Sequence, residues 1–437
     1  MRRNSRRFFD PLYGEMYLSE KEYSLVMSPE IQRLRYVRLC NINSLLITGA
    51  SEISRFEHVV GVLRLAKEWV GCQVNITSKE AEVFTSAALL HDFQTGPFGH
   101  SLQYVFEDNE SDGEDFVHDD LDHGDAYRYH QITDENASFA GRRFETQGIL
   151  GEKWDLVTSL IRGEGELGKL ISGSMDLDNI DNVIRLAYHV GVANSEDADV
   201  ALDLARNLVV EEGRLCCPKR TVVSVERWYQ IRKRLYELLL LDWAEFSAKA
   251  MLTLAMELAI EGNLLGADTW LKTDLEFLSF LEKESIGEHQ RIGNIIKRIR
   301  RGDLYFPLLL LKSKSLQHQE KYTSAESKRA MEKELHNLIL AETGERCSPL
   351  IHPIVDCKKT ERAISLRVLE SGEDMVVGVD SRQLLIGVFF ENSFSSAKKE
   401  FAIENLVREF LSVNGLEDQS DIADPLPAPG ELQLGLL

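Results

Sequence analysis

The sequence has few cysteines and no paired cysteine motif. It contains no CxxC pair and no spacing typical of a zinc site, so we expect its six cysteines to be reduced. The chain also lacks an apolar run of the ~20 residues that a membrane-spanning helix needs. Its opening segment, MRRNSRRFFDP, lacks the apolar stretch of a secretory signal. We therefore expect a cytoplasmic protein that does not cross a membrane.

Positive charge is scarce in this sequence. Lysine and arginine number 50 against 71 aspartates and glutamates, which gives a formal net charge of −21. A general nucleic-acid binder needs basic residues to neutralise phosphates, so this balance argues against that class, although a local basic pocket is compatible with it. With 437 residues the chain exceeds the roughly 250 to 300 residues of a single core, which predicts two units.

The first part of the chain has the apolar spacing of amphipathic helices, from Ser28 to about Ile260. Thr77 and Glu80 form a capping box that predicts a helix ending before Gly96 and Pro97. His91 and Asp92 are therefore expected in the last turn of a buried helix. A second helix is predicted from about Phe56 to Trp69, with Gly71 just past its end and His58 in its first turn.

Later segments differ in pattern. Residues 107–125 (EDNESDGEDFVHDDLDHGD) are strongly acidic and predict a loop. Helical spacing resumes after Asn263 to about His336, and AISLRVLE, MVVGVD and LLIGVFFEN then predict short strands. The expected fold is mainly α. We predict a helical domain with an extension over residues 1–345, and a small α/β region with a tail over residues 346–437.

A histidine next to an aspartate is weak evidence for a site by itself, because chance produces the pair often. Hydrolysis of phosphate esters, however, uses a cation that polarises the phosphoryl group and activates water. A set of two histidines and two carboxylates suits Mn, Fe, Co, Ni or Zn, and suits Mg less well because Mg prefers oxygen ligands.

Three segments around such residues match a known family. They are RFEHVVGV at 55–62, HDFQTGPFGHS at 91–101 and DLDNIDNVIRLAYHVG at 176–191. In roughly its first 260 residues the chain resembles the deoxynucleoside triphosphate triphosphohydrolase branch of the HD superfamily. The resemblance implies an HD-domain helical bundle with one divalent transition metal. The metal ligands that it implies are His58, His91, Asp92 and Asp178.

The resemblance also implies residues that act on the substrate, and here the match is incomplete. Arg55 and Arg232 stand where the family places arginines on substrate phosphates, a good use for charge-assisted contacts. Asn179, Asn182 and Leu186 replace the Lys, Tyr and Asp usual in triphosphate-hydrolysing members. The pocket is therefore expected to bind a standard deoxynucleoside triphosphate differently, or to bind another ligand.

The catalytic acid of the family is a histidine in an H-E-x-x-S context. The best local match is DENAS at 134–138, which places Asp134 where the histidine belongs. His130, four residues earlier, would lie on the same face of a helix. Both His130 and Asp134 remain candidates for the proton donor.

Three functions remain open. The first is hydrolysis of (deoxy)nucleoside triphosphates to nucleoside and triphosphate by a homo-oligomer, with nucleotide effector sites and a role in nucleotide pools or antiviral defence, as the resemblance implies. The second is a phosphohydrolase acting on mono- or cyclic nucleotides. The third is a nucleotide sensor that holds metal without catalysis. The acidic segment 107–125 is read as a mobile gate, a cation binder, a docking site for a basic protein partner, or a solvated linker.

Overall fold

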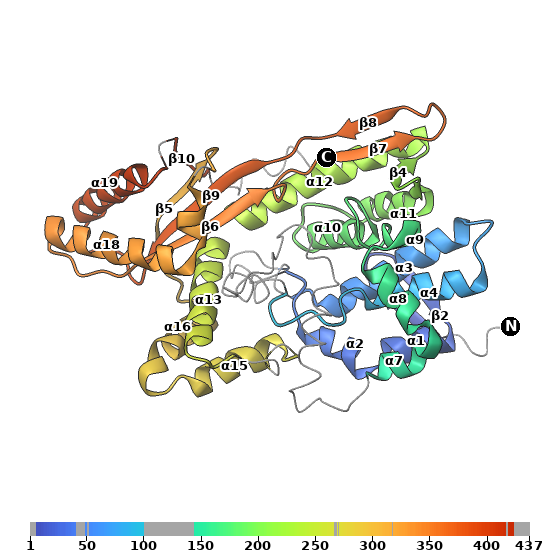
Figure 1. Ribbon diagram of the computed structural model, residues 1–437, viewed down its shortest axis with the longest axis horizontal. Coiled ribbons are helices and arrows are strands. Elements are labelled where there is room, and N and C mark those ends of the chain that lie inside the picture. The colour runs from blue at the N-terminus through green and yellow to red at the C-terminus, as the bar shows by residue number, and fades with distance from the viewer. Residues whose placement is uncertain are drawn as a thin grey trace.

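The computed structural model describes residues 6–40, 49, 52–99, 144–265, 269, 271–316, 318–416 and 418–423, which form helices and three small sheets (Figure 1). The predicted mainly α class is confirmed for this part of the chain. The six cysteines form no disulfide bond in this structure. Among the described residues, no helix combines the length and the apolar character needed to cross a membrane.

The first part of the chain is a helical body with two short hairpins. In chain order its elements are β1 (Arg6–Asp10), β2 (Gly14–Leu18), α1 (Glu20–Val26), α2 (Pro29–Arg33), η1 (Leu34–Tyr36), α3 (Arg55–Cys72), α4 (Ser78–Leu90), α7 (Glu145–Leu150), η2 (Gly151–Lys153), α8 (Trp154–Ile161), α9 (Gly165–Gly168), α10 (Leu177–His189), α11 (Asp197–Asn207), β3 (Val209–Glu211), β4 (Arg214–Cys217), η3 (Lys219–Thr221) and α12 (Val222–Leu241).

The second part combines helices with the larger strands. Its elements are α13 (Trp243–Glu261), α15 (Asp274–Glu284), η4 (Gly287–His289), α16 (Gln290–Arg301), β5 (Phe306–Ser313), α17 (Gln319–Thr323), α18 (Ala325–Thr343), β6 (Pro349–Cys357), β7 (Ile364–Val368), β8 (Asp374–Val377), β9 (Arg382–Phe390), α19 (Ala397–Val413) and β10 (Ser420–Asp421). Strands β7, β8 and β9 confirm the three predicted strand segments.

Helices α3 and α4 pack against each other in the helical body. The predicted capping box of α4 is present, because Thr77 accepts from the Glu80 amide and Glu80 accepts from the Thr77 amide. Helix α3 begins at Arg55 with Ser54 as its N-cap, and it continues through Gly71 to Cys72. The prediction that this helix ends before Gly71 was therefore wrong. Helix α3 packs against α4, α10 and α11, which explains why most of its side chains are buried.

Two strand regions were missed by the helical prediction. The β3–β4 hairpin interrupts the region expected to be all helical, and β5 lies in the stretch after Asn263. Strand β5 carries the run FPLLLLKS, and a short continuous apolar run does not distinguish a buried strand from a buried helix. Pairing with β9 settles the choice, because it supplies backbone partners from Phe306 to Ser313 with one irregularity between Pro307 and Leu309.

The larger sheet has the strand order β10-β5-β9-β6 and is covered on both faces. On β9, Ile386 and Val388 pack towards α18 and α19, whereas Leu385 and Phe389 pack towards α13. This alternation follows from the two-residue period of a strand and explains the nearly continuous apolar sequence of β9. The sheet takes β5 from one side of the predicted boundary at residues 345 and 346 and β6 and β9 from the other. The division into two domains stays a prediction.

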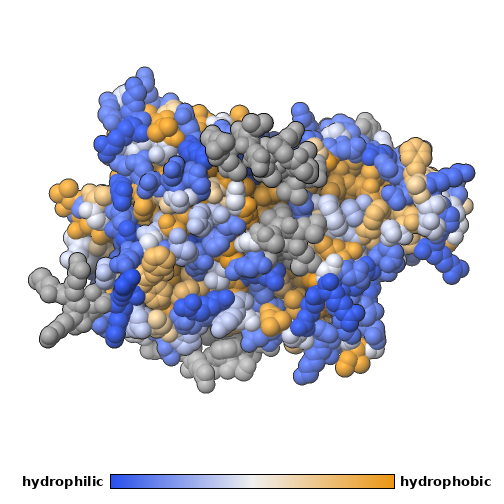
Figure 2. Space-filling view, turned by 180° about the vertical axis from the view of Figure 1, so that it is seen from behind, coloured by the Kyte–Doolittle hydropathy of each residue, from blue (hydrophilic) through white to orange (hydrophobic). Residues whose placement is uncertain are grey.

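The two parts of the chain are joined by a second sheet of order β3-β4-β7-β8, in which β4 pairs with β7 in parallel. Strand β8 of this sheet contacts α12, and strands β6 and β9 of the larger sheet contact α13. On the surface, hydrophilic and hydrophobic residues are interspersed over the face shown in Figure 2. Single exposed apolar side chains, such as Val74 in the loop between α3 and α4 and Phe401 on α19, are ordinary for a folded protein.

Candidate metal centre

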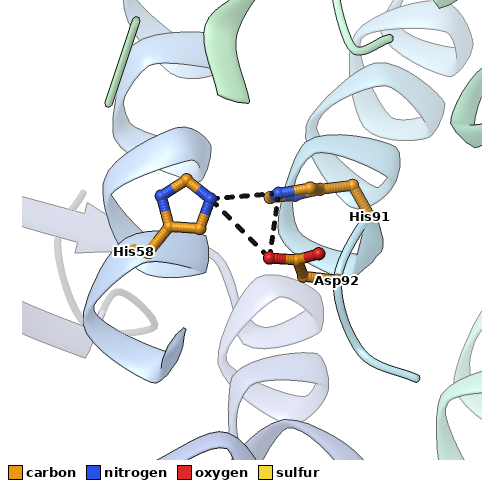
Figure 3. A group of neighbouring side chains, drawn as sticks. All are labelled: His58, His91 and Asp92. Atoms are coloured by element: carbon orange, nitrogen blue, oxygen red, sulfur yellow. Dashed lines mark hydrogen bonds and ion pairs between the residues drawn. The ribbon is translucent and has the colours of Figure 1, made fainter. Parts of the chain in front are cut away.

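Four side chains predicted as metal ligands come together from three helices. His58 lies in the first turn of α3, His91 is the C-cap of α4 and Asp92 follows it, and Asp178 lies in the first turn of α10. The side chains of His58, His91 and Asp92 point toward one another, and their ligand atoms all lie within 4.8 Å of one another (Figure 3). All three residues are buried.

The Nε2 atoms of the two histidines lie close to each other and to both carboxylates. His58 Nε2 lies 3.2 Å from His91 Nε2 and 2.9 Å from Asp178 Oδ1. Asp92 Oδ2 lies 3.8 Å from His58 Nε2 and 3.6 Å from His91 Nε2. Two imidazole nitrogens and two carboxylate oxygens in this arrangement are a donor set that a divalent transition metal accepts.

The other nitrogen of each histidine is engaged elsewhere, which orients both rings. His91 Nδ1 lies 2.9 Å from the carbonyl oxygen of Ala88. Because a carbonyl oxygen can only accept a hydrogen bond, Nδ1 carries the hydrogen. His58 Nδ1 lies 2.8 Å from Asp181 Oδ2. Both Nε2 atoms therefore direct a lone pair into the cluster when the rings are neutral, which is the usual arrangement of metal-binding histidines.

Asp181 is part of a buried charge network behind the cluster. Arg185 donates to Asp181 Oδ2 from Nε at 2.9 Å and to Oδ1 from Nη2 at 2.9 Å, and it also contacts Asp10 at 3.0 Å and Glu57 at 2.7 Å. Asp181 and Arg185 are fully buried. The network fixes the Asp181 carboxylate and, through it, the ring of His58.

Gly61 makes room for this network. It lies one turn after His58 on α3, and a Cβ at this position would stand 2.1 Å from Arg185 Nη2 and 2.2 Å from Asp181 Oδ1. Neither side chain can move away without breaking its buried contacts. The close approach of α3 and α10 at the cluster therefore requires glycine here.

The three aspartates of the segment DLDNID have different partners. Asp176 caps α10 by accepting from the Asn179 backbone amide at 2.7 Å, and Asp181 contacts Nδ1 of His58, the ring nitrogen that faces away from the cluster. Asp178 alone among them is placed against both Nε2 atoms, at 2.9 Å from His58 and 3.5 Å from His91. Of the three, Asp178 is therefore the carboxylate that faces both histidine nitrogens.

The carboxylates shift the pKa values of both histidines. Burial lowers the pKa of His58, but Asp178 and Asp181 outweigh burial and raise it to about 9. Burial also lowers the pKa of His91, and the charges of Asp92 and Asp178 raise it above its ordinary value. Without a cation the cluster therefore retains protons, and a bound metal would have to displace them.

The predicted substrate arginines occupy different positions. Arg55 is buried and forms an ion pair with Asp92, and it also donates to the carbonyl oxygen of Leu39 at 3.2 Å. Arg232 lies on α12, where it donates to the carbonyl oxygen of Lys358 at 3.2 Å and stacks over the ring of Tyr236 at 4.4 Å. The structure thus places Arg55 at the cluster and Arg232 against the loop that follows β6.

The predicted proton donors His130 and Asp134, and the acidic segment 107–125, lie outside the described residues. The network of Asp181, Arg185, Asp10 and Glu57 was not predicted from sequence. Asp181 and Arg185 are four residues apart, a spacing at which side chains on a helix meet. That local signal could have found the pair, but its burial depends on segments far away in the sequence.

The fold and the cluster define a mainly helical protein with a candidate metal centre. No family model matches the chain. It shares its fold with the crystal structure of a phosphohydrolase from Bacteroides thetaiotaomicron, with a TM-score of 0.62 over 88% of this chain and 99% of that chain, at 17% sequence identity. At this identity the similarity shows the fold alone.

Relatives are also found by sequence. The uncharacterized protein MJ1154 of Methanocaldococcus jannaschii is 27% identical over 312 residues, covering 69% of this chain and 58% of that protein. The uncharacterized protein YwfO of Bacillus subtilis is 27% identical over 254 residues, covering 56% and 54%. Human deoxynucleoside triphosphate triphosphohydrolase SAMHD1 is 25% identical over 261 residues, covering 52% and 40%. The match thus spans little more than half the length of the first two relatives.

Proposed function

We propose that this protein is a metal-dependent phosphohydrolase of the HD type that cleaves (deoxy)nucleoside triphosphates to nucleoside and triphosphate. Sequence similarity to a protein named as a deoxynucleoside triphosphate triphosphohydrolase supports a hydrolase of phosphate esters. The fold shared with a phosphohydrolase is consistent with it. The observation that carries the proposal is the convergence of His58, His91 and Asp92 in a buried cluster.

His58, His91, Asp92 and Asp178 would hold a divalent transition metal, which we propose to be Mn, Fe, Co, Ni or Zn, with Mg as a further candidate. When bound, such a metal would polarise the phosphoryl group and lower the pKa of an attacking water. The network around Asp181 keeps the His58 ring in the orientation that binding needs. The helices bury the cluster and limit access of bulk water, which strengthens the electrostatic interactions within it.

Arg55 is a buried cation at the cluster and would face the reacting phosphate in this proposal. Its Nη1 pairs with Asp92, and its Nε has no hydrogen-bond partner within the described part of the chain. A phosphate oxygen at the cluster would supply that partner. Its charge would then offset the negative charge that develops on the phosphoryl oxygens.

In the proposed reaction, water adds to the α-phosphorus and the bond from this phosphorus to the sugar oxygen breaks. The sugar oxygen must then take up a proton. We propose His130 or Asp134 as its donor on the sequence match alone. The role of Arg232 as a phosphate ligand is likewise a proposal.

A second candidate, hydrolysis of mono- or cyclic nucleotides, is favoured by the side chains of α10. Asn179, at a position where triphosphate-hydrolysing members usually carry lysine, donates from its amide to Asp176 Oδ1 at 2.9 Å. Asn182 has a buried Oδ1 with no hydrogen-bond partner among the described residues. This face thus presents amides where a triphosphate would profit from positive charge. A non-catalytic nucleotide sensor is the third candidate.

The test is product analysis by chromatography with purified protein, one of the metals Mn, Mg, Co or Fe, and a panel of nucleoside mono- and triphosphates and cyclic nucleotides. Mixtures of nucleotides are included so that an effector requirement is met. The His91→Ala, Asp92→Ala double variant removes two ligands, and Asp199→Ala, on the exposed face of α11, is the control.

Release of triphosphate that disappears only in the double variant supports the proposal. Release of phosphate from monophosphates, or opening of a cyclic nucleotide, replaces it with the second candidate. Metal-dependent nucleotide binding without any product replaces it with the sensor.

The assembly and biological role are part of the same proposal. We propose a homo-oligomer with nucleotide effector sites, a role in nucleotide pools or antiviral defence, and a cytoplasmic location. Docking of a basic protein partner on residues 107–125 is proposed from charge alone. Light scattering with and without nucleotides would test the oligomer.

A further inference from the structure

The first turn of α15 contacts two segments that border the metal centre. Thr273 and Glu276 cap this helix by themselves, because each accepts a hydrogen bond from the backbone amide of the other. The carboxylate of Asp274 is therefore not needed to cap its own helix. Asp274 is only 5% exposed, and it accepts from the Phe98 amide at 2.7 Å and from the Arg38 amide at 3.0 Å. These partners lie 176 and 236 residues away in the sequence.

Phe98 belongs to the segment that follows His91 and Asp92, two of the proposed metal ligands. Its backbone has a φ of 58°, a conformation that costs free energy for a residue with a bulky side chain. The Phe98 ring is 1% exposed and packs on Phe277 of α15, with 6.4 Å between the ring centroids. Contacts from α15 to both the backbone and the ring of Phe98 thus hold this strained turn in place.

Arg33, the last residue of α2, binds the same segment. Its Nη2 donates to the carbonyl oxygens of Thr95 at 2.6 Å and Phe93 at 3.3 Å. Its Nη1 donates to the carbonyl oxygen of Lys272 at 3.3 Å, just before α15 begins. One guanidinium thus joins the segment after the metal ligands to the residues that precede α15. Arginine suits this position because its donors diverge from a rigid planar group.

Thr95 connects this segment to the metal centre. Its hydroxyl donates to Asp92 Oδ1 at 3.0 Å, and its amide donates to the Asp92 carbonyl oxygen at 3.0 Å. Oδ1 is thus held by the segment, while Oδ2 lies 3.8 Å from His58 Nε2 and 3.6 Å from His91 Nε2. A displaced Thr95 would release Oδ1, and the carboxylate could then turn away from the histidines.

The second segment that Asp274 contacts supports the start of α3. Asp274 holds Arg38 through its amide and through an ion pair with its Nε at 3.4 Å. Val37, the residue before Arg38, accepts from the Arg55 amide at 2.9 Å. Arg55 begins α3, and His58 follows in the first turn of that helix. The placement of these two residues therefore also depends on α15.

We propose that Asp274 and Arg33 are positioning residues for the metal centre. Through them the residues that begin α15 fix the Asp92 carboxylate and the start of α3. The proposal rests on the proposed function, since it takes the cluster to be a metal centre. Helix α15 packs in the hydrophobic core of the second part of the chain, together with α13 and α16. The second part is therefore needed for tight metal binding by ligands that all lie in the first part.

The experiment measures two properties of the full-length protein. Competition with a fluorescent chelator gives the affinity for Mn and, in the same way, for Co and Zn. Mass spectrometry gives the deuterium exchange of backbone amides in residues 91–99. The variants are Asp274→Asn, whose side-chain NH2 must face one of two backbone N–H groups, and Arg33→Lys, which keeps the charge but loses the planar group. Glu284→Gln, at an exposed carboxylate in the last turn of α15, is the matched control.

We expect Asp274→Asn and Arg33→Lys each to weaken metal affinity about tenfold, at the lower end of the range for residues that support metal ligands. Amides in residues 91–99 should exchange faster in both variants, because the segment loses hydrogen bonds that hold it closed. Glu284→Gln should match the wild type in both measurements. Thermal denaturation sets a temperature at which every variant is folded. A folded variant that is less stable but binds metal and exchanges like the wild type has lost only stability, and this result overturns the proposal.

Turnover is measured separately, so the two proposals fail separately. If Asp274→Asn weakens metal binding but the wild type hydrolyses no nucleotide, the positioning role stands and the hydrolase proposal falls. If the wild type hydrolyses nucleotides and all variants bind metal equally, the hydrolase stands and the positioning role falls. A rate that is lowered in Asp274→Asn and restored by excess metal supports both. A wild type that binds none of the three metals overturns both.

Discussion

Replacing Asp181 by asparagine would test whether the buried network positions His58 in the candidate metal centre. Asp181 Oδ2 contacts both His58 Nδ1 at 2.8 Å and Arg185 Nε at 2.9 Å, and Oδ1 accepts from Arg185 Nη2 at 2.9 Å. In asparagine, the side-chain NH2 group must take the place of either Oδ1 or Oδ2. In either position its N–H groups face an N–H of Arg185, so at least one buried hydrogen bond is replaced by a repulsive contact.

The magnitude follows from what Arg185 retains. Breaking a buried ion pair costs about 3–5 kcal/mol when one partner is left alone. Arg185 keeps Asp10 at 3.0 Å and Glu57 at 2.7 Å, so we expect a loss of roughly 2–3 kcal/mol in the free energy of unfolding. The loosened His58 ring should weaken metal affinity by about 10- to 100-fold, as for other partners of metal-binding histidines.

Urea denaturation and competition for Mn with a fluorescent chelator would measure these two quantities. Asp199→Asn, an exposed carboxylate on α11, controls for the loss of one negative charge. If Asp181→Asn unfolds at the wild-type urea concentration and binds Mn as tightly as Asp199→Asn, the network does not position His58 and the reasoning is refuted.

Three further predictions concern single positions. Gly61→Ala should lower the free energy of unfolding by about 1–3 kcal/mol in urea, because its Cβ would meet Arg185 at 2.1 Å, and a wild-type midpoint would contradict this close approach. Burial raises the pKa of Glu332 from 4.5 to about 7, so this group binds a proton more readily in the folded state and stability falls as pH rises from about 4.5 to about 7. Glu332→Gln keeps the acceptor for the Ile351 amide. It should raise the free energy of unfolding by up to about 3 kcal/mol at pH 8 and by little at pH 4. Urea denaturation at both pH values measures this difference, and equal gains at both would be inconsistent with this pKa. The pKa of His58 is raised to about 9, so metal binding at pH 7.5 should release a proton and should weaken as pH falls below about 9. Calorimetric titration with metal in buffers of different ionisation enthalpy measures the protons released. Binding without proton release would mean that the pKa of His58 is ordinary.

Local features were predictable because their cause lies in neighbouring residues. The capping box of α4 joins Thr77 and Glu80, three residues apart, and it needs nothing from the rest of the chain. The strands β7 and β8 likewise follow from short β-branched segments ended by Gly and Asp. The nature of β5 was not predictable, since its apolar run acquires a strand conformation only by pairing with β9.

For the candidate site, too, the sequence indicated one part and tertiary packing decided the other. The order of the motifs indicated which histidines and aspartates to consider, and the resemblance selected four of them. The distances among His58, His91, Asp92 and Asp178 depend on the packing of α3, α4 and α10, which the sequence pattern does not contain. The surroundings of Arg232 were equally hidden, because its partner Lys358 is 126 residues away.

By itself the sequence determined the approximate positions of α3, α4 and the last strands, and it placed His91 at the end of a helix. Only the tertiary structure decided that Asp181 supports His58, because Arg185 holds this carboxylate together with Asp10 and Glu57, which lie 175 and 128 residues from Arg185. The physical reason is burial. Charges that water would solvate in an isolated helix must find one another inside the folded protein, and packing alone brings them within reach.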